Sequence, residues 1–254
     1  TTYVLPVTIK SVEGIGVLQS AKTYYYVFRG ASLINVVCNI SRNRAYPDFK
    51  NDSKFNNLTE NTMEILFKAN SFPNTLNTLM GIESNYLLRI GDATIPNNQL
   101  QVATSVNNCT SADLQLESGK WYHVAVAFNK GNVKVYINGV EKLSGSTGKS
   151  SVSLGAKHTN EEDGSRCFWV GYSYKDDRYF DGVVSEVRIW NRALTAEEIQ
   201  ATNHFYTIEP ESEGLIAYWK FDEGSGTVAK DYSVSGYDLT IEKEPKWESV
   251  SLPQ

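Results

Sequence analysis

Residues 119–143 read GKWYHVAVAFNKGNVKVYINGVEKL. Two runs in this stretch, at 121–128 and 133–137, place an apolar residue at every second position. Side chains two apart in a strand point to the same face, so each run has one face suited to burial. Turn residues separate the runs at 129–132, and Asn138-Gly139, a strong hairpin signal, follows the second run. The segment therefore predicts an antiparallel sheet that is buried on one side.

A second informative segment, residues 180–199, reads FDGVVSEVRIWNRALTAEEI. Its first half is rich in β-branched and aromatic residues, as strands are. Thr195 is followed three positions later by Glu198, which is the spacing of a capping box. In that arrangement the threonine side chain accepts from a backbone N–H of the first turn, and the glutamate accepts from the threonine N–H. The segment predicts a strand that leads into a short helix.

Together, the segments 121–139 and 180–199 resemble the second half of a laminin-G-like domain of the concanavalin A-type lectin and glucanase superfamily. The resemblance implies an all-β fold: a two-sheet antiparallel jelly-roll sandwich with one short helix. It also gives His123 a structural place in the Trp-x-His-Val motif. The implied function is carbohydrate-associated binding at a cell surface or in a secreted protein.

The rest of the chain alternates between short strand patterns and clusters of Gly, Asn, Ser and Pro, as sandwiches and jelly rolls do. Further strands are predicted at 33–38, 61–69, 78–83, 86–90, 99–103 and 167–172. Residues 42–57 are polar and irregular, so we expect a long surface loop there.

Three parts are expected along the chain. Residues 1–30 contain two strand patterns and resemble the last hairpin of the immunoglobulin-like domain that precedes laminin-G-like domains in surface lipoproteins of Gram-negative gut bacteria. Residues 31–254 form the jelly roll. Within it, residues 213–254 contain LIAYWKFDEGSG, a motif that usually opens such a domain. Because this tail is too short for a second core, we expect it to complete the sandwich as a displaced strand, with the start of a truncated second domain as the alternative.

Composition narrows the classes of function. The 254 residues carry a net charge of −5, which provides no basic stripe for nucleic acid or for an anionic membrane. No apolar run reaches the ~20 residues that cross a bilayer.

The chain starts Thr1-Thr2-Tyr3, so we expect a processed or truncated product without its leader. Cys38, Cys109 and Cys167 match no zinc or disulfide framework and are predicted to be buried thiols, with a Cys109–Cys167 bridge as the alternative.

No catalytic constellation is evident. A retaining glycosidase needs two carboxylates about 5 to 5.5 Å apart, hence an alternate spacing if both lie on one strand. The acidic clusters instead contain adjacent residues, which point to opposite faces of a strand. No serine lies in a Gly-x-Ser-x-Gly elbow. We therefore predict a protein that is not an enzyme, and a glycoside hydrolase of the same superfamily stays the first alternative.

Aromatic residues in loops indicate a carbohydrate site. The loop 172–179 reads YSYKDDRY and combines rings with polar groups of both signs, as sugar recognition requires. The predicted ligand-binding residues in this loop are Tyr172, Tyr174, Arg178 and Tyr179. Tyr86 and Arg89, near strand ends, form a second and weaker candidate. The structural alternative is that the tyrosines only cover the rim of the sheet.

A calcium site is a further possibility in the tail. Asp222, Asp231 and Asp238 could supply oxygen ligands, although their spacing matches no EF-hand. The overall prediction is a non-catalytic, lectin-like module of a bacterial surface or secreted glycan-utilisation protein. Its partners would be an oligosaccharide or polysaccharide, together with the proteins of a surface uptake complex. The second alternative is a protein–protein adhesion module, which would show an apolar patch at its rim.

Overall fold

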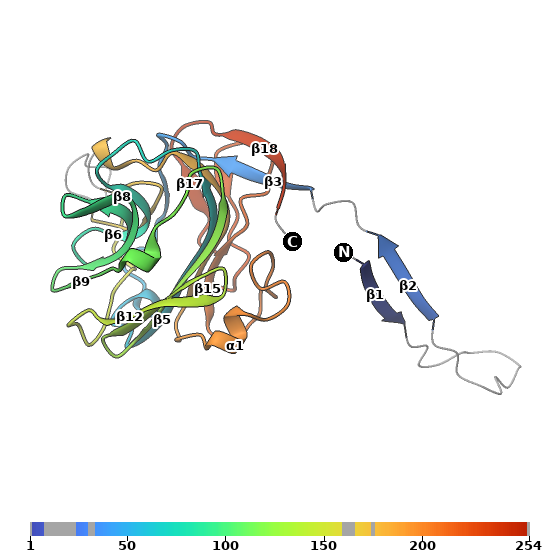
Figure 1. Cartoon of the computed structure of the whole chain (residues 1–254), viewed down its shortest axis with the longest axis horizontal. Coiled ribbons are helices and arrows are strands. Elements are labelled where there is room, and N and C mark those ends of the chain that lie inside the picture. The colour runs from blue at the N-terminus through green and yellow to red at the C-terminus, as the bar shows by residue number, and fades with distance from the viewer. Residues whose placement is uncertain (1, 8–23, 30–33, 159–165, 174–175, 253–254) are drawn as a thin grey trace, which may run out of the picture. The chain divides into compact units, whose positions relative to one another are not determined.

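The computed structural model describes residues 2–7, 24–29, 34–158, 166–173 and 176–252. The chain divides into two compact units, Thr1–Asn35 with Ser249–Gln254, and Val36–Glu248. The first unit contains a hairpin in which β1 (Thr2–Val7) pairs antiparallel with β2 (Tyr24–Arg29) (Figure 1). Its assignment to an immunoglobulin-like domain stays a prediction.

The second unit contains two antiparallel sheets of eight strands each (Figure 1). In the first sheet the order is β12-β11-β10-β5-β14-β3-β18, and β15 also pairs with β14. The bounds are β3 Ile34–Asn39, β5 Glu60–Ala69, β10 Trp121–Asn129, β11 Asn132–Ile137, β12 Val140–Ser146, β14 Gly182–Trp190, β15 Leu215–Trp219 and β18 Lys246–Ser251.

The second sheet has the order β16-β17-β4-β13-β6-β7-β8-β9. Its strands are β4 Ala45–Pro47, β6 Asn77–Ile82, β7 Tyr86–Asp92, β8 Ile95–Thr104, β9 Asn108–Cys109, β13 Trp169–Val170, β16 Val228–Ala229 and β17 Leu239–Ile241. The described helices are η1 Ser53–Phe55, η2 Ala112–Leu114, η3 Asp176–Arg178 and α1 Ala196–Ile199. The predicted jelly-roll sandwich is confirmed.

The core lies between the two sheets, and the alternating residues of the first informative segment supply much of it. The apolar faces of β10 and β11 are buried, as predicted: Val124, Val126, Phe128, Val133, Val135 and Ile137. The turn from β11 to β12 has positive φ at both central residues, 50° at Asn138 and 77° at Gly139. Asn-Gly suits this geometry because both residues tolerate the left-handed region, which matches the twist of a two-residue hairpin.

The prediction of a surface loop at 42–57 is wrong. This segment contains β4 and η1, and Phe49 and Phe55 are fully buried with their rings stacked at 3.8 Å. Its apolar residues are separated by irregular numbers of polar ones, so the segment has no period. Burial is achieved here by single anchoring side chains instead of by one face of a regular strand.

The tail contributes to both sheets. β15 pairs antiparallel with β14 in the first sheet, while β17 pairs with β16 and β4 in the second. Trp219 and Phe221 are fully buried in the core between them.

A second apolar cluster lies on the opposite face of the first sheet. It joins residues of β10, β11, β14 and β15 to α1 and its flanking loops, with Trp190, Ile199 and Tyr218 among its members. The capping box predicted at Thr195 is present, since Thr195 Oγ1 accepts from Glu198 N and Glu198 Oε2 accepts from Thr195 N. Segment 191–214 therefore covers this face.

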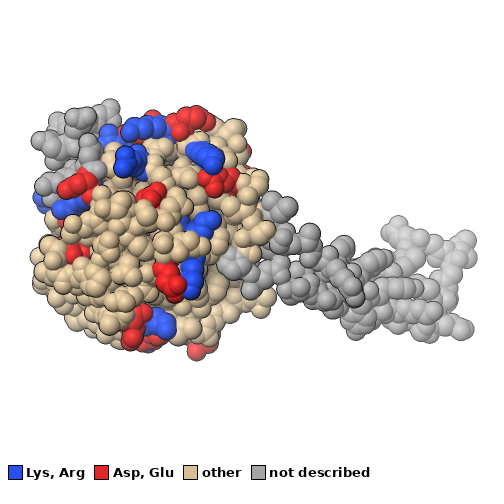
Figure 2. All heavy atoms as spheres, turned by 45° about the horizontal axis from the view of Figure 1, so that its top comes forward, with Lys and Arg blue, Asp and Glu red and all other residues tan. Residues whose placement is uncertain are grey.

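Other predictions from composition concern the surface and the cysteines. In the described part of the chain, no helix has both the length and the apolarity for a membrane span. Basic and acidic side chains are interspersed on the face drawn in Figure 2, without a large patch of one sign. All three cysteines are buried, and the Cys109 thiol donates to the Ser146 carbonyl (3.3 Å), so it is not bridged to Cys167.

Candidate functional site

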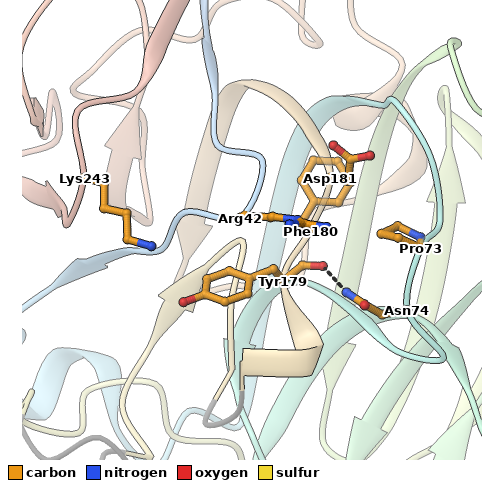
Figure 3. A pocket seen from close by; sticks show the side chains of 7 residues that line it. All are labelled: Arg42, Pro73, Asn74, Tyr179, Phe180, Asp181 and Lys243. Carbon is orange, nitrogen blue, oxygen red and sulfur yellow. Dashed lines mark hydrogen bonds between the residues drawn. The ribbon is translucent and has the colours of Figure 1, made fainter.

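A polar pocket of about 300 Å³ opens at one end of the sandwich. Three loops form most of it: the loop after β3, the loop after β5 and the loop before β14. Figure 3 shows its lining side chains, which are Arg42, Pro73, Asn74, Tyr179, Phe180, Asp181 and Lys243.

Strand register explains why these loops converge. On β14, Gly182 is opposite Ala69, the last residue of β5, and Val183 is opposite Asn39, the last residue of β3. Backbone hydrogen bonds extend the pairing past the strand ends, from Asn70 N to Asp181 O (2.9 Å) and from Arg42 N to Phe180 O (3.3 Å). The residues beyond all three strand ends therefore lie at the same place in the fold.

Tyr179 is the aromatic residue at the opening of the pocket, and its surroundings hold it in position. Its carbonyl accepts a hydrogen bond from Asn74 Nδ2 (3.0 Å), drawn in Figure 3. Its ring packs against that of Tyr172, with centroids 4.9 Å apart, and Tyr172 in turn contacts Trp169. The guanidinium of Arg44 lies over the Tyr172 ring at 4.9 Å. A half-buried ring fixed by buried aromatic neighbours loses little further entropy when it binds a ligand.

Charges of both signs line the pocket. Asp181 is the single carboxylate of its lining, and its oxygens accept from Ser71 Oγ (2.5 Å) and, more weakly, from Asn70 Nδ2 (3.4 Å). Arg42 and Lys243 are exposed. Arg42 has a φ of 53°, which lies in the left-handed region. Residues other than Gly and Asn adopt this region at an energetic cost. The arrangement offers hydrogen-bond donors and acceptors next to a ring face.

The loop 172–179 contributes to the pocket only in part. Tyr179 lines the pocket, whereas Tyr172 is only 2% exposed and supports it from below. Arg178 belongs to η3 and pairs with Glu83 (2.9 Å), so it does not line the pocket. Tyr174 lies outside the described residues.

The prediction of Tyr86 and Arg89 as contacts for a ligand needs correction, because both side chains are buried. Tyr86 is 0% exposed and packs against Phe128 inside the core. Arg89 is 7% exposed and donates to Gln101 Oε1 (2.8 Å from Nε) and Asp92 Oδ2 (2.6 Å from Nη2). Both positions follow strand patterns, and the sequence did not show that these faces are covered.

Two of the three aspartates of the tail, Asp231 and Asp238, have structural partners. Asp231 accepts from the backbone N–H groups of Tyr218, Ser233 and Tyr237 (2.9 to 3.0 Å), and Asp238 accepts from the Asp231 N–H. Asp222 is exposed. These three carboxylates are not among the described groups whose ligand atoms converge within 4.8 Å. Both carboxylate oxygens of Asp231 already accept hydrogen bonds from backbone N–H groups. Calcium binding by the three aspartates stays a prediction.

Sequence reasoning did not identify Arg42, Asn74, Asp181 and Lys243. Arg42, Asn74 and Lys243 lie in loops without a motif of their own, and Asp181 lies in segment 180–199, which was interpreted only as a strand that leads into a helix. A signal existed in the strand pairing, because antiparallel neighbours of β14 must end where β14 begins. Using that signal requires the register of β3 and β5 against β14, which periodicity alone does not provide.

The sequence matches one protein family. A family model described as the concanavalin A-like lectin/glucanases superfamily matches residues 43–200. No curated protein matches the chain.

Solved structures are also similar to this chain. A candidate carbohydrate binding protein of Bacteroides ovatus aligns over 99% of this chain and 70% of that one, with 26% identity and a TM-score of 0.74. Domain 4 of an extracellular arabinanase from Geobacillus stearothermophilus, in complex with arabinotriose, aligns over 65% and 74%, with 22% identity and a TM-score of 0.46. The SAP-like pentraxin of Limulus polyphemus aligns over 69% and 84%, with 13% identity and a TM-score of 0.46.

Proposed function

Because the chain belongs to the concanavalin A-like lectin/glucanases superfamily, we propose that it binds carbohydrate without cleaving it. The family match confirms the resemblance inferred from residues 121–139 and 180–199. The similar structure from Bacteroides ovatus, a candidate carbohydrate binding protein, supports the same class of ligand. An oligosaccharide or polysaccharide is the proposed partner.

The observation that carries this proposal is the pocket at Tyr179. A pyranose has apolar C–H faces and a rim of hydroxyl groups, so it binds where a ring face adjoins planar hydrogen-bonding groups. The pocket combines the Tyr179 ring with the Asp181 carboxylate and the side chains of Arg42 and Lys243. Affinity for a short oligosaccharide should be weak, since each hydrogen bond replaces one to water and gains only ~1 kcal/mol net.

The hydrolase alternative requires a second carboxylate near Asp181. Glycosidases hold their two carboxyl groups about 5 to 9.5 Å apart across the scissile bond. Among the described residues that line the pocket, Asp181 is the one acidic residue. This composition favours binding over catalysis at this place.

The adhesion alternative requires an apolar patch at the rim. Among the described residues, the large hydrophobic side chains that are exposed are four valines at separate positions: Val106, Val140, Val228 and Val234. Scattered single residues of this kind are normal for a soluble surface. We therefore place carbohydrate binding ahead of adhesion, and we propose that the protein works at a bacterial surface or outside the cell as part of a glycan-utilisation complex.

A glycan array with the purified chain, read with and without calcium, tests the proposal and identifies a ligand. Titration calorimetry with that ligand then compares the wild type with Tyr179→Ala. We expect at least tenfold weaker binding and little change in melting temperature, because the Tyr179 side chain is only half-buried. Tyr232→Ala is the matched control, since Tyr232 is also half-buried but does not line the pocket.

Two results would contradict the proposal. One is an array without any carbohydrate ligand in either condition. The other is binding that survives Tyr179→Ala and Asp181→Asn together, which would place the site elsewhere.

A further inference from the structure

Glu64, His123 and His204 form a buried cluster on the face of the first sheet that is turned away from the inter-sheet core. Met63 and Ile65 point into that core, so Glu64 points to the opposite face. His204 comes from segment 191–214, which covers this face. The three side chains are 5% exposed or less. Sequence analysis gave His123 a structural place only, and the sugar-binding proposal uses none of these residues.

The ligand atoms of the cluster converge on one point. Oε1 of Glu64 lies 2.5 Å from His204 Nε2 and 3.3 Å from His123 Nε2. One atom from each residue can be chosen so that all three lie within 4.8 Å of one another. Two imidazole nitrogens and one carboxylate oxygen form a set of ligands that suits Zn²⁺.

His123 provides a second, independent indication. Its side chain is 0% exposed, yet neither ring nitrogen makes a hydrogen bond within the described part of the structure. The ring stacks on Phe205 at 4.5 Å. Its 3.3 Å approach to Glu64 Oε1 does not have hydrogen-bond geometry. A buried polar atom without a partner is costly, and a metal ion bound at Nε2 would satisfy it.

The neighbours of Glu64 orient it as outer-shell groups orient a metal ligand. Trp190 Nε1 donates to Glu64 Oε2 (2.6 Å), and Arg188 Nη1 lies 3.7 Å from the same oxygen. This leaves Oε1 as the oxygen that faces both imidazoles. Arg188 also donates to the His204 carbonyl (2.7 Å), which holds the covering segment in place. Outer hydrogen bonds of this kind fix the orientation of ligating side chains.

The charges of the buried groups agree with a bound cation. Arg188 lies 2.5 Å from Glu186 and 3.7 Å from Glu64, so two buried carboxylates share one guanidinium.

We propose that Glu64 Oε1, His123 Nε2 and His204 Nε2 bind a divalent transition-metal ion, with Zn²⁺ the best match. The ion has a structural role, because it joins β5 and β10 to the segment that follows α1. Zn–N and Zn–O bonds of about 2.0 to 2.2 Å place two tetrahedral ligand atoms roughly 3.4 Å apart. The ion would therefore replace the present hydrogen bond between Glu64 Oε1 and His204 Nε2 (2.5 Å) and move these atoms apart by roughly 0.9 Å. Hard cations such as Mg²⁺ prefer oxygen ligands and serve as the negative control.

The test uses the full chain, stripped with a chelator under mild denaturation and refolded with or without one equivalent of Zn²⁺. Mass spectrometry of the metal content should show about one zinc per chain after gel filtration. The melting temperature should rise with Zn²⁺ concentration and stay constant with Mg²⁺. With a water as the fourth ligand, Co²⁺ in place of Zn²⁺ should give the intense visible absorption of a four-coordinate site.

His204→Gln and His158→Gln are the matched pair of variants. We expect His204→Gln to lose the bound zinc and the thermal shift. His158 stacks on Tyr46 away from the cluster, so His158→Gln should keep both. If His204→Gln does not fold, the metal content and the Co²⁺ spectrum of the wild type decide alone. A wild type that binds no zinc and shows no thermal shift overturns the proposal, and so does a His204→Gln variant that retains one equivalent.

Discussion

Arg42 has an unfavourable backbone conformation in the pocket that we propose as the binding site. Its φ of 53° would suit glycine, yet an arginine occupies the position and lines the pocket. Arg42→Gly removes the guanidinium and relieves the backbone at the same time. We therefore expect binding of the cognate glycan to weaken by at least tenfold, while the melting temperature stays equal or rises. Calorimetric titration and thermal unfolding measure the two effects.

Lys50→Gly is the control for this substitution. Lys50 has a φ of 52°, is exposed and lies outside the pocket lining, so the variant makes the same change of charge and of backbone freedom. It should keep full affinity. Equal loss of affinity in both variants would show that net charge, and not the pocket, governs binding.

The short helix α1 depends on its N-terminus, where Glu198 has two roles. Burial works against its charge, but the hydrogen bond from Thr195 N and the ion pair with Arg192 (2.7 Å) lower its pKa below 4.5. The stabilisation is therefore present above pH 4.5 and is lost as the pH falls through the lowered pKa. Because the side chain is partly exposed, we expect Glu198→Gln to cost about 0.5 kcal/mol at pH 7.

Urea unfolding of the wild type and of Glu198→Gln at several pH values measures this contribution. The difference between the two proteins should decrease toward zero as the pH falls below 4.5. Glu197→Gln, an exposed neighbour on the same helix, should cost less at pH 7. A difference for Glu198→Gln that does not change with pH would mean that the charge contributes nothing.

Strand β15 shows how much the core depends on the tail. Trp219 is fully buried, lies near the rings of Phe49 and Phe168, and donates from Nε1 to the Tyr237 carbonyl (2.9 Å). Trp219→Ala should lower the free energy of unfolding by about 3 to 5 kcal/mol. Trp247→Ala, at a half-buried position in the same tail, should cost clearly less. Urea unfolding followed by far-ultraviolet circular dichroism measures both, and equal costs would contradict this account of the core.

The elements differ in how well the sequence predicts them, and the reason is periodicity. Some strands have alternating polar and apolar residues or a continuous apolar run, and their positions follow from the sequence within a residue or two. These strands are β5, β10, β11 and β14. β4 has three residues and no period, and it was missed. The pocket was predicted only through Tyr179. Its other groups come from loops whose proximity depends on strand register, which is a property of the sheet and not of any one segment.

Across the whole molecule, the carboxylates differ in burial and in the groups that they bind. Glu64 and Glu186 are both buried. Glu64 accepts from Trp190 and hydrogen-bonds to His204, and Glu186 accepts from Arg188. Asp231 is used by backbone N–H groups of the tail. Asp181 lies in the pocket without a second acidic residue in its lining. Under the proposed function this carboxylate would contact a sugar, and among the described lining residues it has no acidic partner for a glycosidic bond.

We therefore expect no hydrolysis of any glycan that the protein binds. Glycoside hydrolysis needs two carboxyl groups at the same bond, one as general acid and one as nucleophile or base. Asp181 can supply only one of the two. The measurement is prolonged incubation of each array ligand, and of a panel of aryl glycosides, with the purified chain, followed by detection of new reducing ends. Asp181→Asn separates contamination from catalysis. Turnover by the wild type that Asp181→Asn abolishes would show that the pocket is an active site, whereas turnover equal in both proteins would come from a contaminating enzyme.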